Sequence, residues 1–238
     1  MARRSPLTDV IEHHLNRRGC LLEAGCGLGQ YVLLLREKGV RAVGADWSFE
    51  AVSRGARAGA PLAVMDLRAL GVRAGSVSTY LSLGVVEHDP DGPDAIVREA
   101  ARVLAPGGVL LLSVPYWNGV RRLFGPYVAR RNARTRAGGG QFYQFAFSRH
   151  EVGAFLRARG FAVRSFHPYD PARVLRTARR ALIRTTSAPA NREPPVRRQA
   201  SRQGDRRMSP ARVLRALLYT PPALRLFGHM ILAVAVRA

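Results

Sequence analysis

Three closely spaced glycines follow a short apolar segment, and an acidic residue precedes them. The sequence reads Glu23-Ala-Gly25-Cys26-Gly27-Leu-Gly29. Glycines at this spacing let the backbone turn tightly and let a ligand approach where a β-carbon would collide. A helix that starts after the glycines would present its N-terminal amides to that ligand. The third glycine comes one residue too early for the G-x-G-x-x-G pattern of dinucleotide-binding proteins.

Acidic residues follow the next two segments that are expected to be strands. Asp46 ends the second expected strand, 21 residues after Gly25. At that position its carboxylate is placed to accept hydrogen bonds from ribose hydroxyls. Asp66 follows the third expected strand, where it could bind the amine edge of an adenine, with Met65 and Leu67 beside the ring. These acids therefore predict a nucleoside-containing ligand at the glycine-rich segment.

The elements that must position these residues alternate between strands and helices. Strands are predicted over 20–23, 40–46, 62–65, 77–83, 109–114, 161–166 and 230–236. Helices are predicted over 7–15, 31–38, 48–58, 94–104 and 148–159, with Ser48 and Ser148 as N-caps. Strands that alternate with helices at this spacing imply a parallel sheet covered on both faces. The sequence therefore predicts a doubly wound α/β fold.

The pattern loosens after residue 115. Residues 116–147 are irregular and carry 8 of the 18 aromatic residues, together with several arginines. This mixture predicts a lid over an apolar or anionic substrate. The alternative is a minor core with a charged outer face. A basic amphipathic helix is expected over 171–183, a flexible linker over 185–204, and a helix over 209–219 that Pro221-Pro222 breaks.

The net charge of +22 is unevenly distributed along the 238 residues. Residues 1–120 carry 13 basic and 12 acidic side chains, whereas residues 121–207 carry 21 arginines and 4 acidic side chains. The excess therefore belongs to the second half, where it predicts contact with an anionic membrane surface or with nucleic acid. A GC-rich genome is an alternative source of the arginines. The apolar content of 47% excludes wholesale disorder, and two cysteines are too few for a disulfide framework or a zinc site.

Five segments within residues 20–115 resemble, in order and spacing, the class I S-adenosylmethionine-dependent methyltransferases, near the group of ubiquinone/menaquinone methyltransferases. The segments are Leu22-Glu23-Ala-Gly25-Cys26-Gly27-Leu-Gly29, Val43-Gly44-Ala-Asp46-Trp-Ser48, Met65-Asp66, Leu83-Gly84-Val-Val-Glu87-His88 and Arg102-Val-Leu-Ala-Pro106-Gly107-Gly108. The resemblance implies a Rossmann-like sheet of seven strands whose last strand is antiparallel. It also implies a methyltransferase domain formed by 1–168 with 228–238, which a basic helical insertion over 170–227 interrupts.

The resemblance implies S-adenosyl-L-methionine as the cofactor and assigns its contacts. Glu23, Gly25 and Gly27 should line the methionine end of the cofactor, and Leu83 should lie beside it. Asp46 should hold the ribose, and Asp66 the adenine amine. The further expected contacts with the cofactor are Cys26, Gly29, Trp47, Met65 and Leu67. No metal is expected.

Methyl transfer from a sulfonium is an in-line displacement, so the enzyme must mainly align the acceptor and exclude water. A general base is needed only where the acceptor atom keeps its proton. His88 is the leading candidate because it follows the fourth strand, and Tyr116, after the fifth, is a weaker one. The alternative for His88 is a loop histidine that supports the cofactor site.

We therefore expect an enzyme that methylates a small or lipid-like metabolite. The alternatives are a nucleic-acid methyltransferase that uses the basic half of the chain, and a non-catalytic module that binds the cofactor or a partner. The apolar run at 226–236 is far shorter than the ~20 residues that span a bilayer. We expect a cytoplasmic protein, with peripheral contact to the inner face of an anionic membrane.

Overall fold

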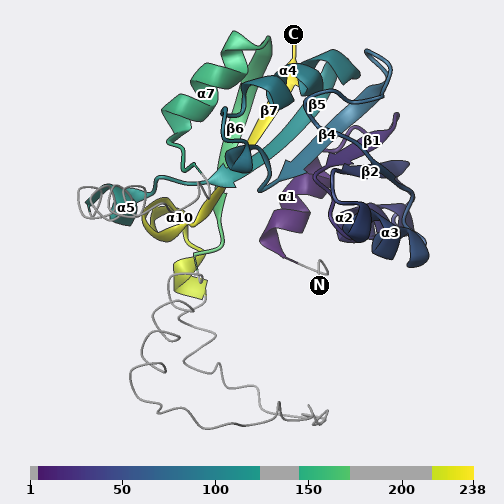
Figure 1. The fold of residues 1–238 in the computed structure, drawn as a ribbon. Coiled ribbons are helices and arrows are strands. Elements are labelled where there is room, and N and C mark those ends of the chain that lie inside the picture. Colours follow the sequence, from purple (N-terminus) through teal and green to yellow (C-terminus); the bar gives the residue numbers. More distant parts are fainter. Residues whose placement is uncertain (1–4, 124–144, 172–215) are drawn as a thin grey trace, which may run out of the picture.

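A seven-stranded sheet forms the centre of the protein (Figure 1). The computed structural model describes residues 5–123, 145–171 and 216–238. The strands lie in the order β3-β2-β1-β4-β5-β7-β6. Their bounds are β1 Leu21–Ala24, β2 Ala42–Asp46, β3 Leu62–Val64, β4 Val77–Leu83, β5 Leu104–Pro115, β6 Phe161–Tyr169 and β7 Met230–Arg237. Strands β1 to β5 pair in parallel, and β7 pairs antiparallel with both β5 and β6. This topology confirms the predicted fold class and the reversed last strand.

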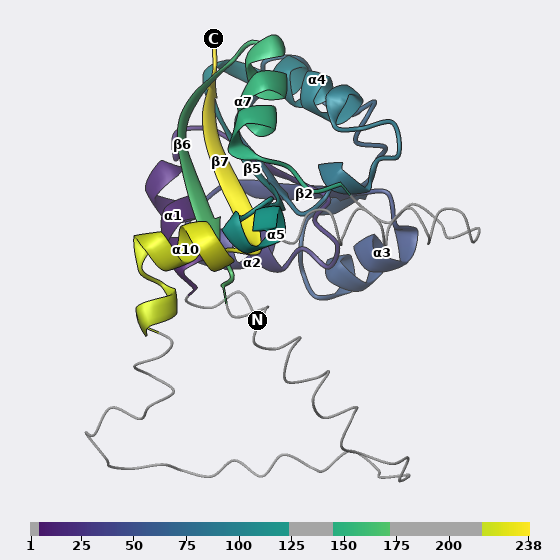
Figure 2. The ribbon, with the colours of Figure 1, turned by 90° about the vertical axis from the view of Figure 1, so that its left-hand side faces the viewer.

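Helices cover both faces of the sheet (Figure 2). Buried side chains of α1 and α2 pack on one face, and those of α4 and α7 pack on the other. The helices are α1 Pro6–His14, α2 Gln30–Glu37, α3 Phe49–Arg57, α4 Asp94–Val103, α5 Gly119–Leu123, α7 Arg149–Ala158 and α10 Pro221–Phe227, with a short 3-10 helix η1 at Val86–His88. The two apolar faces are the reason that a strand-helix alternation in the sequence becomes a layered fold.

Local capping chemistry explains where several of these helices begin. The Ser148 hydroxyl accepts a hydrogen bond from the amide of Glu151, and the Glu151 carboxylate accepts one from the amide of Ser148. Ser48 caps α3 in the same way through the amide of Ala51. These two contacts confirm the caps that the sequence predicts, because the serine oxygens satisfy amides that have no partner within the helix.

Three elements differ from the sequence-based expectations. The helix that precedes Pro221-Pro222 ends before them, as expected, but the two prolines also open a further helix, α10, where a missing amide hydrogen costs nothing. Strand β5 begins at Leu104, five residues before the strand expected over 109–114, and its pairing with β4 shifts in register between Leu104 and Val109. Helix α5 forms inside a segment expected to be irregular.

Several expectations fall on residues outside the described ranges. They concern the basic helix over 171–183 apart from Pro171, the linker over 185–204, and most of the segment 116–147. Of the helix expected over 209–219, residues 216–219 are described, and residues 216–218 are helical. Among the residues that the structure describes, no helix is both long and apolar enough to span a bilayer.

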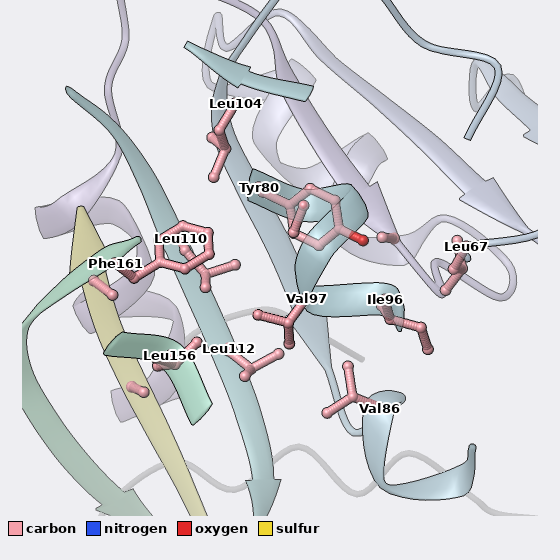
Figure 3. Close-up of a cluster of buried hydrophobic side chains, with 14 of the residues drawn as sticks. Leu67, Tyr80, Val86, Ile96, Val97, Leu104, Leu110, Leu112, Leu156 and Phe161 are labelled. Atoms are coloured by element: carbon pink, nitrogen blue, oxygen red, sulfur yellow. The ribbon is translucent and has the colours of Figure 1, made fainter. Parts of the chain in front are cut away.

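The larger apolar core lies between the sheet and helices α4 and α7 (Figure 3). Tyr80 of β4 is fully buried in it, near Leu67 and Ile96. Its hydroxyl oxygen has no hydrogen-bond partner among the described residues. Burial also raises the pKa of the phenol, so the hydroxyl stays neutral. A buried polar atom without a partner is costly, and this one reduces the stability of the fold.

Replacing Tyr80 with phenylalanine is expected to raise the free energy of unfolding by about 1–2 kcal/mol, because it removes a buried hydroxyl that has no partner. The matched control is Tyr169→Phe. The Tyr169 hydroxyl is hydrogen-bonded to the Ser113 hydroxyl, so its removal should lower stability instead, by about 1 kcal/mol. Urea denaturation of the two variants measures both changes. A Tyr80→Phe protein less stable than the wild type would contradict the prediction.

Candidate active site

The carboxyl ends of the parallel strands meet at one edge of the sheet. In the strand order, β1 and β4 are neighbours although β2 and β3 separate them in the sequence. The chain therefore leaves β1 and β4 in opposite directions across the sheet, and ligands of open α/β sheets bind in the crevice at such a point. The glycine-rich segment after β1 and the segment Leu83–His88 after β4 flank this position.

The amides of the glycine-rich segment point into the protein. Those of Gly25 and Cys26 donate to the carbonyl of Ala45 at 2.8 and 3.1 Å. The Gly27 amide donates to Asp46 Oδ2 at 2.8 Å. Because these donors already have partners, the segment is not the anion-binding amide nest of phosphate-binding loops. What it offers a ligand is close approach to a backbone without side chains.

Gly25 and Gly27 differ in what surrounds them. Both have positive φ, at 78° and 52°. A β-carbon built on Gly25 would lie 2.3 Å from Cγ2 of Val85, in the segment after β4, so the two segments are in close contact. A β-carbon on Gly27 would meet nothing within 4 Å. The open space at Gly27 is therefore where a ligand can approach the segment.

Two carboxyl groups lie beneath the glycines. Glu23, at the end of β1, is 5% exposed, and its Oε2 accepts a hydrogen bond from the Val32 amide at 3.2 Å. Burial, and then the charge of Asp46, raise the Glu23 pKa to about 8, although the Val32 amide opposes the shift. The carboxyl is therefore neutral at pH 7 in the free protein. A cation placed beside it would favour its ionised form.

Asp46 braces the glycine-rich segment from the end of β2. Besides the Gly27 amide, its carboxylate accepts a hydrogen bond from the Ser48 amide at 2.9 Å. Since Ser48 itself is the N-cap of α3, Asp46 is not the cap of that helix. These two bonds hold the Asp46 carboxylate in one orientation at the edge of the sheet, next to the open space at Gly27. Trp47, the following residue, is 82% exposed at the same edge.

The three residues expected around an adenine, Met65, Asp66 and Leu67, differ in their exposure to solvent. Asp66 is exposed, and both of its oxygens are held by the guanidinium of Arg68, at 2.9 Å for the shortest contact. Arg68 also lowers the Asp66 pKa through hydrogen bonds to its carboxylate. Met65 is half-buried, whereas the side chain of Leu67 lies in the core. Sequence reasoning missed Arg68, although its spacing of two residues from Asp66 was visible.

The other expected contacts with the cofactor lie around the same strand ends. Leu83 is half-buried at the end of β4, and Gly29 is the residue before α2. Cys26 is buried against Gly44 of β2, where a β-carbon would lie 2.7 Å from its sulfur. Burial, together with Glu23 and Asp46, raises the Cys26 pKa to about 12. Its thiol is therefore a packing group and not a nucleophile.

The two catalytic candidates follow β4 and β5. His88 ends η1 and is exposed. The preceding Glu87 is 2% exposed, and burial raises its pKa to about 7. Its Oε2 has no hydrogen-bond partner among the described residues. Glu87 belongs to the Leu83–His88 motif, but its burial, which marks it out, is not visible in the sequence.

Tyr116, after β5, is the point at which three distant segments meet. Its amide donates to the carbonyl of His229 at 2.9 Å, and the next amide, of Trp117, donates to Phe147 at 2.8 Å. The guanidinium carbon of Arg149 lies 5.7 Å from the centre of the Tyr116 ring. The described ends of the 116–147 segment therefore both lie at the carboxyl edge of the sheet, beside the start of β7.

Three features together define the class of protein as S-adenosylmethionine-dependent methyltransferases. They are the strand order, the glycine-rich segment beside β4 and the buried acids at neighbouring strand ends. The fold is similar to that of such an enzyme from Methanosarcina mazei (16% identity, 98% of each chain, TM-score 0.64). It is also similar to a geranyl diphosphate C-methyltransferase from Streptomyces coelicolor (16% identity, 98% of this chain and 77% of that chain, TM-score 0.60). A Haloferax volcanii methyltransferase complex with the activator Trm112 is a third similar structure (20% identity, 97% and 87%, TM-score 0.59).

Residues 3–166 match the methyltransferase domain family. The chain belongs to this family, and it is an S-adenosylmethionine-dependent methyltransferase with S-adenosyl-L-methionine as its cofactor. No curated protein matches the chain in a sequence comparison. The family and the cofactor expected from the sequence motifs are confirmed.

Proposed function

We propose that the protein transfers the methyl group of S-adenosyl-L-methionine to a small or lipid-like acceptor by in-line displacement. One observation carries the proposal: two buried carboxyl groups, Glu23 and Asp46, lie beside glycines whose amides are already paired within the protein. Such a site suits a cationic cofactor without phosphate. When bound, this cofactor supplies an electrophilic methyl group with an excellent leaving group.

Each side of the cofactor has its own residues in this proposal. Glu23, Gly25 and Gly27 face its methionine end together with Leu83, and Asp46 accepts hydrogen bonds from the ribose. Asp66 receives the adenine amine in competition with Arg68, which occupies its carboxylate in the structure. Cys26 and Gly29 shape the glycine-rich segment from behind. Trp47 and Met65 flank the adenine, while Leu67 supports them from the core.

The acceptor side lies at the ends of β4 and β5 in this proposal. We propose that the segment 116–147 aligns the acceptor and excludes water, and the hydrogen bonds that hold its described ends at the sheet edge support this role. We also propose residues 1–168 with 228–238 as the methyltransferase unit and 170–227 as its insertion. The place of β7 between β5 and β6 supports this division.

A structural neighbour supports an acceptor that is both apolar and anionic. The Streptomyces coelicolor enzyme was solved with geranyl diphosphate and S-adenosyl-L-homocysteine. The arginines of the segment 116–147 and of the later chain would suit such an acceptor here.

The test is cofactor binding followed by an acceptor screen. At a concentration of S-adenosyl-L-methionine a hundredfold above Kd, we expect the melting temperature to rise by about 5–10 °C. Release of S-adenosyl-L-homocysteine is then measured with amphiphilic acids, neutral lipids and RNA. Turnover with RNA alone would favour a nucleic-acid methyltransferase, and binding without turnover on any acceptor would favour a non-catalytic module.

For an acceptor that must lose a proton, replacing His88 with alanine is expected to lower kcat by about 10²-fold, since His88 is an exposed histidine in the segment that follows β4. The Kd of the cofactor should stay unchanged, which isothermal titration calorimetry checks. His13→Ala is the control, because His13 is exposed on α1. A His88→Ala protein with full turnover would remove His88 from the mechanism.

A further inference from the structure

A pocket of about 270 Å³ lies beside the carboxyl end of β6, the edge strand of the sheet. Four elements distant in sequence line it: α1, the start of α7, β6, and α10 with the residues before it. Its walls are mainly apolar, with Leu7 and Val10 from α1, Phe166 from β6 and Leu224 from α10. This volume is just below the range of about 300–1,000 Å³ that is usual for small-molecule sites, so the pocket suits a small ligand.

The charged side chains of the pocket are all basic. Arg149 and Arg225 line it, and none of its described lining residues carries a carboxylate. His167 lines it as well, but burial and the nearby His14 and His13 lower the His167 pKa, so the ring is neutral at pH 7. The positive charge therefore comes from the two arginines, and a ligand with an anionic group would complement it.

Arg149 is the better placed of the two arginines. Its Nε is buried and has no hydrogen-bond partner among the described residues. Its guanidinium lies over the ring of Tyr116, and no carboxylate of the described residues forms an ion pair with it. A buried donor of a charged group is costly without a partner, and an anionic ligand in the pocket would provide that partner.

The pocket adjoins the edge of the sheet at which methyl transfer is proposed. Tyr169 lines the pocket, and its hydroxyl is hydrogen-bonded to Ser113 of β5. Arg149 in turn contacts Tyr116, at the end of β5. With a spacing of about 4.8 Å between strands, β6 lies about 14 Å from β4 in the strand order. A ligand of modest length can therefore extend from the pocket toward the candidate methyl-transfer site.

We propose that this pocket binds a small single-chain amphiphile, with its apolar chain against Leu7, Val10 and Leu224 and its carboxylate or phosphate group on Arg149. The assignment of this ligand as the methyl acceptor rests on the proposed function. The binding itself depends only on the pocket. An amphiphile fits because the apolar walls suit its chain and the two arginines suit its anionic group. No described lining residue carries a carboxylate that would repel that group.

The experiment is calorimetric titration of the full-length protein with decanoate, decyl phosphate and decanol. We expect both anions to bind the wild type, and the neutral alcohol to bind at least tenfold more weakly. Arg149→Gln should weaken both anions about tenfold, or ~1.4 kcal/mol, and leave decanol unchanged. Leu224→Trp should weaken all three probes, because it fills the pocket. Arg54→Gln is the matched control, since Arg54 is exposed on α3.

Equal binding of decanoate to the wild type and to Arg149→Gln would overturn the proposal, because the anion would then bind elsewhere on the arginine-rich chain. Equal binding of decanol and decanoate to the wild type would overturn it as well. S-adenosyl-L-methionine is titrated in parallel and should bind Arg149→Gln as it binds the wild type, which also shows that the variant is folded. Failure of the wild type to bind this cofactor would overturn the proposed function and leave the amphiphile result standing.

Discussion

Alanine at Gly27 is expected to leave the protein folded but to weaken its binding of S-adenosyl-L-methionine by about 10–100-fold. A β-carbon at this position meets no protein atom within 4 Å, so the apoprotein has room for it. The positive φ of 52° costs a non-glycine residue about 1–2 kcal/mol, which most folds tolerate. The added methyl group would instead occupy the space through which the cofactor approaches the backbone. Calorimetric titration measures the loss of affinity.

Alanine at Gly25 is the informative comparison, because there the obstacle is the protein itself. The new β-carbon would lie 2.3 Å from Cγ2 of Val85, at a φ of 78°. We expect the free energy of unfolding of the apoprotein to fall by about 2–5 kcal/mol. Adding Val85→Ala should recover part of that loss, since it removes the contacting methyl groups. Wild-type cofactor affinity in the Gly27→Ala protein would refute the assignment of the glycine-rich segment to the cofactor.

Cofactor affinity is expected to rise by up to tenfold per pH unit between about pH 6 and 8, because the Glu23 carboxyl must lose its proton. In the free protein burial raises the Glu23 pKa to about 8, so the carboxyl is protonated at pH 7. The ammonium and sulfonium groups of S-adenosyl-L-methionine favour the carboxylate and lower that pKa. Binding at pH 7 should therefore release close to one proton. Titrations in two buffers of different ionisation enthalpy count the protons released.

Glu23→Gln should remove both the proton release and the rise in affinity with pH, and Glu50→Gln, an exposed residue of α3, is the matched control. The Glu23 carboxyl also affects the free energy of unfolding. Between pH 4.5 and about 8 the unfolded chain has lost the Glu23 proton and the folded chain has kept it. Stability therefore falls as the pH rises through this window, by at most about 5 kcal/mol. Proton release that persists in Glu23→Gln would show that another group titrates.

Local patterns in the sequence determined most of the element order and predicted the glycine-rich segment as the candidate cofactor site. Turn residues, caps and the alternation of apolar residues depend on neighbours along the chain, so they can be read without coordinates. The cap at Ser148 and the glycine-rich segment after β1 are examples. The same local patterns predicted the break at Pro221-Pro222 but not the helix α10 that these prolines open, because two prolines are compatible with both a break and the first turn of a helix.

Only the tertiary structure decided the chemical state of the site residues and the walls of the pocket at Arg149. Glu23 is protonated at pH 7 because the sheet buries it, and Leu67 is a core residue for the same reason. The arginine excess in the second half of the chain is compatible with an anionic partner or with a GC-rich genome, and it does not indicate a binding position. The pocket at Arg149 combines segments from both ends of the chain, and its composition depends on which surfaces fold against one another. Burial and the meeting of distant segments are properties of packing, and no local pattern encodes them.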